Sequence, residues 1–178
     1  TGSAKSFGLG PGSSPTNGIG ELGMGASHGN SPDGGGCGYG VGTGLTYGNI
    51  SSMPLLGGSG GNEDPNSTVA PGGGAGGGAI FIAAPVQVTL GAAGSVTAQG
   101  GDSGTGSLPD ISGGGSGGAI RLRAETVSLA AGSQLIGRGG VPQAFGCSSG
   151  GDGRVRIEAS TVNNGGTING SQSIVNAP

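Results

Sequence analysis

The sequence predicts an all-β protein, in which a short right-handed parallel β-helix (a solenoid) follows an irregular glycine-rich half of polyproline-II-like character. Three observations favour this fold class. Of the 178 residues, 49 are glycine and 10 are proline, so helices are disfavoured. Apolar residues make up 31% and aromatic residues 3%, which is too little for a thick two-layer core. An alternating apolar pattern recurs three times after residue 72, which indicates a repeat architecture.

Residues 1–71 form the first predicted domain and show almost no sustained periodicity. Segments such as GLGPG at 8–12 and GGGCGYGVGTG at 34–44 place glycine at every second or third position. Either this half is disordered, or it forms extended strands and turns that lie against the second half. The many isolated apolar residues favour the second interpretation, an ordered but irregular cap.

Residues 72–178 form the second predicted domain, a solenoid of three coils at about 72–112, 113–149 and 150–178. The middle copy, GGGSGGAIRLRAETVSLAAGSQLIGRGG at 113–140, is the best formed. Each copy contains three short strands separated by small residues. Variable glycine-rich loops follow the first two copies, at 102–112 and 141–149. Alternation at i, i+2 sends the apolar residues of each run to one face, as in a strand.

The three copies align residue by residue, so we expect equivalent apolar side chains to stack in ladders along a narrow core. The third strand of each copy contributes Val96, Leu135 and Ile168. A small antiparallel β-sandwich with glycine-rich turns is the alternative. The predicted core ladder of the first two strands consists of Ile80, Ile82, Val88, Leu90, Ile120, Leu122, Val127, Leu129, Val155, Ile157 and Val162.

The outward positions of the first strand in each copy carry most of the basic residues. Phe81 aligns with Arg121 and Arg156, which predicts a lateral contact between Phe81 and Arg121. In the next outward column Arg123 aligns with Glu158, which predicts a second favourable pair. Phe81, Arg121, Arg123 and Arg156 therefore form a candidate surface-binding stripe.

The net charge indicates which classes of partner the chain could attract. A formal net charge of −3 with only 8% charged residues offers no electrostatic attraction to nucleic acid or to acidic membranes. The sequence contains no apolar run of 18 residues or more. We therefore expect neither a nucleic-acid partner nor insertion into a membrane.

We expect no enzymatic activity, no cofactor and no metal centre. The calcium-binding solenoid motif G-G-x-G-x-D is incomplete, because Gly78 and Ala119 stand at the aspartate position. His28 is the only histidine, and its neighbours Ser31 and Asp33 are more typical of a turn than of a catalytic triad.

Two further features favour an extracellular or cell-surface location. Cys37 and Cys147 both lie in glycine-rich loops. In a secreted chain they would form a disulfide, and closing so long a loop would stabilise the fold by about 4–5 kcal/mol. The alternative is two unpaired thiols. Asn-X-Ser/Thr sequons make Asn49, Asn66 and Asn169 candidate N-glycosylation sites.

The motifs GASHG at 25–29, Tyr47-Gly48, Met53-Pro54 and GGSGG at 57–61 precede the strands GGGAGGGAIFIAA and VTLGAAGSVTAQGG. This order resembles the glycine-rich, β-helix-type repeats of large extracellular and cell-surface proteins of bacteria, algae and protists. The resemblance implies a structural or adhesive module, such as the self-associating subunit of a surface fibre or filament, and no enzyme. Other extracellular structural proteins would be its further partners. The alternative is a carbohydrate-binding or carbohydrate-active β-helix that binds glycans through the stripe.

Overall fold

A computed structural model describes residues 28–30, 46–62, 72–104, 112–142 and 148–176. All regular elements in these ranges are β-strands, and they include no helix that could cross a membrane. The strands are β1 (Ala79–Ala83), β2 (Gln87–Leu90), β3 (Ser95–Thr97), β4 (Ala119–Arg123), β5 (Thr126–Leu129), β6 (Gln134–Ile136), β7 (Arg154–Glu158), β8 (Thr161–Asn164), β9 (Thr167–Asn169) and β10 (Ser171–Val175).

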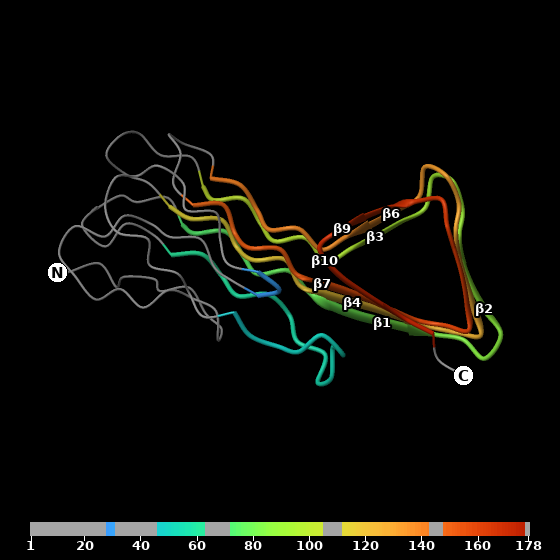
Figure 1. Cartoon of the computed structure of the whole chain (residues 1–178). Helices are drawn as coiled ribbons and strands as arrows, with labels where there is room; N and C mark the ends of the chain where they lie inside the picture. The colour runs from blue at the N-terminus through green and yellow to red at the C-terminus, as the bar shows by residue number, and fades with distance from the viewer. Residues whose placement is uncertain (1–27, 31–45, 63–71, 105–111, 143–147, 177–178) are drawn as a thin grey trace, which may run out of the picture.

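Each pass of the chain contributes one strand to each of three parallel sheets. Sheet A has the order β1-β4-β7-β10, sheet B the order β2-β5-β8, and sheet C the order β3-β6-β9. Figure 1 shows the three sheets as the sides of a triangle. We call one pass a coil and the ten strands together the triangular stack. The arrangement is consistent with a parallel β-helix, and parallel pairing argues against the antiparallel sandwich. The predicted third coil, 150–178, contains a fourth strand that the sequence does not predict, since β10 returns to sheet A and begins a further pass.

The register between coils is the predicted one. Ile80 pairs with Ile120, which pairs with Val155 on its other side. In sheet B one inward-facing column consists of Leu90, Leu129 and the polar Asn164, as the alignment of the three copies predicts. In sheet C the column is Val96, Leu135 and Ile168.

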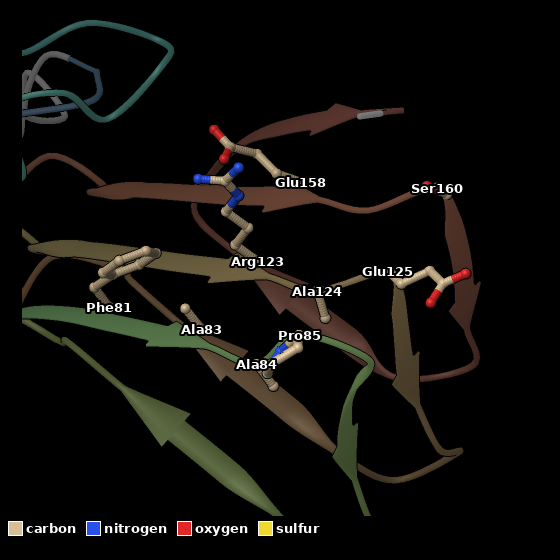
Figure 2. A pocket seen from close by; sticks show the side chains of 9 residues that line it. All are labelled: Phe81, Ala83, Ala84, Pro85, Arg123, Ala124, Glu125, Glu158 and Ser160. Carbon is tan, nitrogen blue, oxygen red and sulfur yellow. The ribbon is translucent and has the colours of Figure 1, made fainter. Parts of the chain in front are cut away.

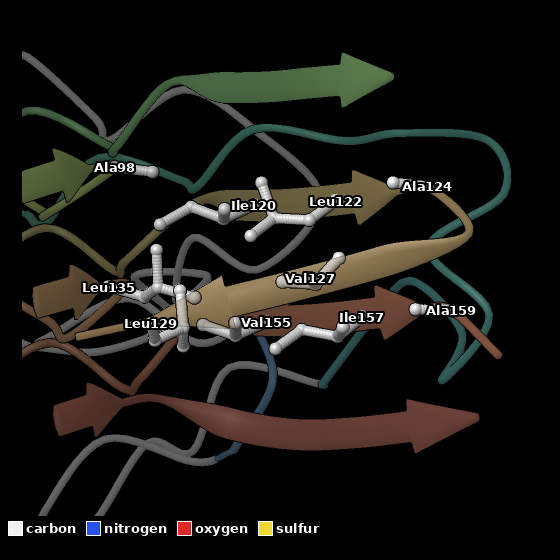
Figure 3. Packing of buried hydrophobic residues seen from close by; sticks show 10 residues of the cluster. All are labelled: Ala98, Ile120, Leu122, Ala124, Val127, Leu129, Leu135, Val155, Ile157 and Ala159. Carbon is white, nitrogen blue, oxygen red and sulfur yellow. The ribbon is translucent and has the colours of Figure 1, made fainter. Parts of the chain in front are cut away.

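The core lies inside the triangle and is best formed in the middle coil (Figure 3). Leu122 there is only 1% exposed, but its ladder neighbour Ile82 in the first coil is 36% exposed. Ile82 is therefore not the buried core residue that the pattern predicts, because the first coil has a neighbour on one side only. The other predicted ladder residues of the outer coils divide into partly buried side chains (Ile80, Val88, Leu90 and Val162) and buried ones (Val155 and Ile157).

Glycine-rich extended segments run side by side away from one corner of the triangle (Figure 1). We call these segments the glycine lattice: 57–62, 72–78, 98–104, 112–118, 137–142 and 148–153. Their hydrogen bonds rotate with a period of three residues. Along 112–118, N–H groups of Gly113 and Ser116 donate to 59–62, those of 114 and 117 to 148–151, and those of 115 and 118 to 98–101. Three residues per turn is the period of a polyproline-II helix.

The lattice requires glycine because backbones approach one another closely. A Cβ atom on Gly77 or Gly118 would lie less than 3.0 Å from backbone atoms of neighbouring segments. None of the lattice glycines has a positive φ, so closeness and not a left-handed conformation is the constraint. Gly78, one residue beyond Gly77, has open space at the same position.

The lattice changes two expectations about the glycine-rich runs. The described parts of the predicted loops at 102–112 and 141–149 are extended lattice segments, hydrogen-bonded to their neighbours. The lattice also crosses the predicted domain boundary at 71, since Gly58 and Gly61 donate to Gly77 and Gly74. The rest of the predicted cap, apart from 28–30 and 46–62, lies outside the described residues.

Candidate functional site

The outer face of sheet A gathers the side chains of the predicted stripe. Phe81, Arg121, Arg156 and Ser173 form one outward column across the four strands of the sheet. The guanidinium carbon of Arg121 lies 5.0 Å from the centre of the Phe81 ring, so the predicted cation–π contact is present. The Phe81 side chain stays 51% exposed, because the first coil leaves it uncovered on the other side.

Glu158 on β7 is the centre of an ion network. Its carboxylate accepts a hydrogen bond from Arg121 at 2.8 Å and another from Arg156 at 2.5 Å. Arg123, the partner that the alignment predicts for Glu158, lies opposite it in register but makes neither of these ion pairs. The register fixes which Cα atoms are opposed, but arginine is long enough to reach a carboxylate in the neighbouring column.

The network sets the protonation state of Glu158. Burial acts to raise the pKa of its carboxyl group, while the hydrogen bonds and charges of Arg121 and Arg156 lower it. The arginines prevail, and the pKa of Glu158 lies below its ordinary value of 4.5. Glu158 is therefore ionised at neutral pH and binds two guanidinium groups, that of Arg156 on its own strand and that of Arg121 on the neighbouring β4.

Two arginines of the stripe are occupied inside the molecule. The side chains of Arg121 and Arg156 are each only 13% exposed. Arg156 also donates to the Ile50 carbonyl at 3.2 Å and to the Ser173 hydroxyl at 2.9 Å. The stripe as predicted is thus incorrect for these two residues, because Glu158 binds both and Arg156 also contacts the Ile50 carbonyl. Phe81 and Arg123 are its exposed members.

A groove of about 670 Å³ opens beside these two exposed residues (Figure 2). Its apolar lining includes Ala83, Ala84, Pro85 and Ala124, where the chain turns from sheet A to sheet B. Figure 2 shows the Arg123 side chain extending from β4 toward the strand that carries Glu158. The remaining polar lining comes from Glu125 and Ser160.

A buried polar cluster joins the lattice to the segment 46–62. His28 is 1% exposed, stacks on the Tyr47 ring at 4.6 Å between centroids, and donates from Nδ1 to the Gly117 carbonyl at 2.8 Å. The Tyr47 hydroxyl donates to the Gly57 carbonyl and accepts a hydrogen bond from Ser59, whose backbone N–H donates to the Ser116 hydroxyl. His28, Tyr47 and Ser59 belong to the S-H-G, Y-G and G-S-G-G motifs. The sequence shows the order of these motifs, but it does not predict that they contact one another.

Burial governs the chemistry of His28. Desolvation lowers the pKa of its imidazole, the hydrogen bond to Gly117 acts to raise it, and the charge of Arg154 lowers it further. The net effect is a pKa below 6.5, so the ring is neutral at neutral pH. Arg154 in turn donates to the Tyr47 carbonyl at 3.1 Å, which fixes the chain next to the ring. The cluster thus holds the chain around Tyr47 in place. Ser31 and Asp33, the other residues of the triad considered from the sequence, lie outside the described residues.

The other candidate residues are more scattered. Asn49 is exposed, and its side-chain oxygen accepts hydrogen bonds from Ser51 and from the backbone of Met53. Asn169 is exposed on β9. Asn66, Cys37 and Cys147 lie outside the described residues. Within the described ranges, no group of three histidine, cysteine, aspartate or glutamate side chains could hold a metal ion.

Comparison with known proteins gives no relative from which a function could be transferred. No family model matches the chain, and searches of the curated proteins and of the solved structures find no match.

Proposed function

We propose that this chain is an extracellular structural or adhesive module: a right-handed parallel β-helix that self-associates, end to end, into a surface fibre. Its partners are further copies of itself or similar structural proteins. The observation that carries this proposal is the contrast in burial along the core ladders. The ladder position of Leu122 is 1% exposed and that of Ile157 is 0% exposed, but Ile82 at one end is 36% and Ile174 at the other end is 46% exposed.

Both ends of the stack therefore expose an isoleucine of the same ladder, although the last end also carries Gln172 and Asn164 at other ladder positions. Among the described residues, each end offers an outer strand of sheet A with one unpaired edge, and the ladder of Ile82 and Ile174 ends there in solvent. Val86 adds to the first end, where it is 65% exposed beside β2. A further parallel strand at either end would continue the ladders and satisfy the edge. Joining unlike ends is a heterologous contact, which propagates into a fibre without closing.

The experiment that tests this proposal measures assembly of two end variants by sedimentation velocity over a concentration series. Ile82→Lys places a charge at the first end, and Ile174→Lys places one at the last end. Gln134→Lys, at an exposed position in the middle coil, is the matched control. We expect the control to assemble like the natural chain and each end variant to stay monomeric.

A mixture of the two end variants makes the test specific for unlike ends. Each variant keeps one intact end, so the mixture should form dimers that grow no further. Dimers of Ile82→Lys alone would instead show that like ends meet, and would overturn the fibre. A natural chain that stays monomeric at every concentration would reject self-association. Thermal unfolding of each variant confirms that the lysine has not unfolded it.

A further inference from the structure

We propose that the groove beside Phe81 and Arg123 is a binding site for an acidic saccharide, one that carries a carboxylate on a pyranose ring. The site lies on the outer face of sheet A and at the turn into sheet B, and Phe81 and Ala83 of β1 place one side of it next to the first end of the stack. It does not depend on self-association.

The size and shape of the groove fit a short sugar chain. Its volume of about 670 Å³ falls within the range of roughly 300–1,000 Å³ that is usual for small-molecule sites. Small side chains line its apolar part, among them Ala83, Ala84 and Ala124. An oligosaccharide can therefore approach the backbone turn without displacing a bulky residue.

Phe81 supplies an apolar platform that is held in position. Its ring is half exposed, and Arg121 lies over it at 5.0 Å. Arg121 is itself fixed by Glu158, which Arg156 also binds. The face of an aromatic ring carries negative charge density and attracts the polarised C–H bonds on one side of a pyranose. A platform that is already ordered loses little side-chain entropy when a ligand binds.

The charge balance favours an acidic ligand. Arg121 and Arg156 share this face with the buried carboxylate of Glu158, and both are bound to it. Arg123 and the exposed Glu125 line the groove itself, so the three arginines and two glutamates together carry a net charge of +1. Among the residues that the structure places, no ion pair includes Arg123. An arginine guanidinium binds a carboxylate through two parallel hydrogen bonds, which makes Arg123 the residue that selects the acid.

The same geometry disfavours an extended acidic peptide. Backbone recognition of a peptide requires unpaired N–H and C=O groups, as at a sheet edge. The Arg123 end of this groove lies over β4, whose backbone is paired with β1 on one side and β7 on the other. Side chains are what the outer face offers here, and a sugar ring with a carboxylate uses both an aromatic face and a guanidinium.

The test is calorimetric titration with a glucuronate oligosaccharide and with the neutral glucose oligosaccharide of the same length and linkage. We expect the acidic sugar to bind at least about tenfold more tightly than the neutral one, the factor that one charged hydrogen-bonded pair provides. Arg123→Gln should remove this preference. Arg138→Gln removes the same charge at an exposed position outside the groove and should leave it unchanged.

Phe81→Leu keeps an apolar side chain but removes the ring. It should lower the affinity for both sugars and leave the ratio of the two affinities unchanged. Equal affinity for acidic and neutral sugars, or equal effects of the two arginine variants, would overturn the proposal. So would no binding to either sugar, or a tighter response to a hexaglutamate peptide than to the glucuronate. The Arg123→Gln chain should sediment like the natural chain, so a failure here is distinguishable from a failure of fibre assembly.

Discussion

The triangular stack and the glycine lattice both join extended segments by backbone hydrogen bonds, but they pack these segments in opposite ways. Both are built from extended segments that hydrogen-bond to neighbours far away in the sequence. In the stack, each strand bonds within one sheet and projects Ile, Val or Leu into a shared core. In the lattice, the backbone of 112–118 bonds in three directions, and at most of the glycines a Cβ would collide with the next chain. Apolar side chains stabilise the stack, whereas the lattice packs backbone against backbone at its glycines.

The two regions therefore tolerate opposite substitutions. Removing atoms from an apolar side chain leaves a cavity in the stack, whereas the lattice glycines have no side chain to lose. Adding atoms in the lattice forces whole backbones apart, whereas a strand position on the outer face of the stack accepts them.

The largest effect should come from truncating the middle of the core. Leu122→Ala removes a side chain that is 1% exposed, and we expect the free energy of unfolding to fall by about 2–5 kcal/mol. Ile82→Ala, one coil earlier in the same ladder, should cost at least about 1 kcal/mol less, because Ile82 is already partly in solvent. Denaturant unfolding of dilute protein measures both. Equal costs would mean that the first coil is covered in solution.

The stack is the part of the fold that the sequence predicts well. Alternating apolar residues fix the face, and equivalent residues such as Ile120 and Val155 then fix the register. β10 escapes prediction because its sequence, SQSIV, has only one apolar residue at an inward position, Ile174. The pattern also predicts Ile82 as buried, since alternation shows which way a side chain points but not whether a further coil covers it.

The lattice and the site are less predictable for related reasons. Glycine has no side chain whose periodicity could be read, so a run of glycines looks the same in a loop and in a close-packed segment. The register predicts Phe81 beside Arg121 correctly, because that contact is between directly opposed residues. It does not predict that Glu158 binds Arg121 and Arg156, since those contacts depend on arginine conformation.

The ion network on the outer face of sheet A gives the next prediction. Glu158→Gln keeps the size of the side chain but removes the charge that two guanidinium groups bind, so we expect a loss of about 1.5–3 kcal/mol in unfolding free energy. Glu125→Gln, at an exposed position near by, should change it by less than about 0.5 kcal/mol. Chemical denaturation of both variants decides the matter. If the two behave alike, the ion network contributes nothing to stability.

Two adjacent glycines test the lattice itself. Gly77→Ala places a methyl group against neighbouring backbones, and overpacking of this kind costs about 1–3 kcal/mol. Gly78→Ala meets open space and has no positive φ to lose, so we expect no loss, or a gain of up to about 1 kcal/mol. Melting temperatures of the two variants give the comparison. A Gly77→Ala chain as stable as Gly78→Ala would contradict close packing there.

The smallest effect is a dependence on pH that separates the two buried polar sites. The folded state lowers the pKa of His28 below 6.5, so the unfolded chain binds more protons, and stability should fall as the pH drops through 6.5. Glu158, whose folded pKa lies below 4.5, stabilises the fold above pH 4.5 and loses that contribution as the pH falls through its folded pKa. Each group contributes a slope of at most about 1.4 kcal/mol per pH unit.

Unfolding free energies measured from pH 8 to pH 3 should show both windows in the natural chain. His28→Gln should flatten the upper window and leave the lower one, and Glu158→Gln should do the reverse. An upper window that survives His28→Gln would assign it to another group and contradict a buried neutral imidazole.

The rotation of hydrogen bonds along 112–118 limits how such a chain can change in length. Each residue turns the next donor by about a third of a revolution, so the fourth N–H again faces the same neighbour as the first. Inserting a single residue would redirect every later donor to the wrong partner, but inserting three would restore the phase. Lattice segments should therefore accept insertions and deletions in multiples of three, much as a coding sequence accepts them without losing its frame.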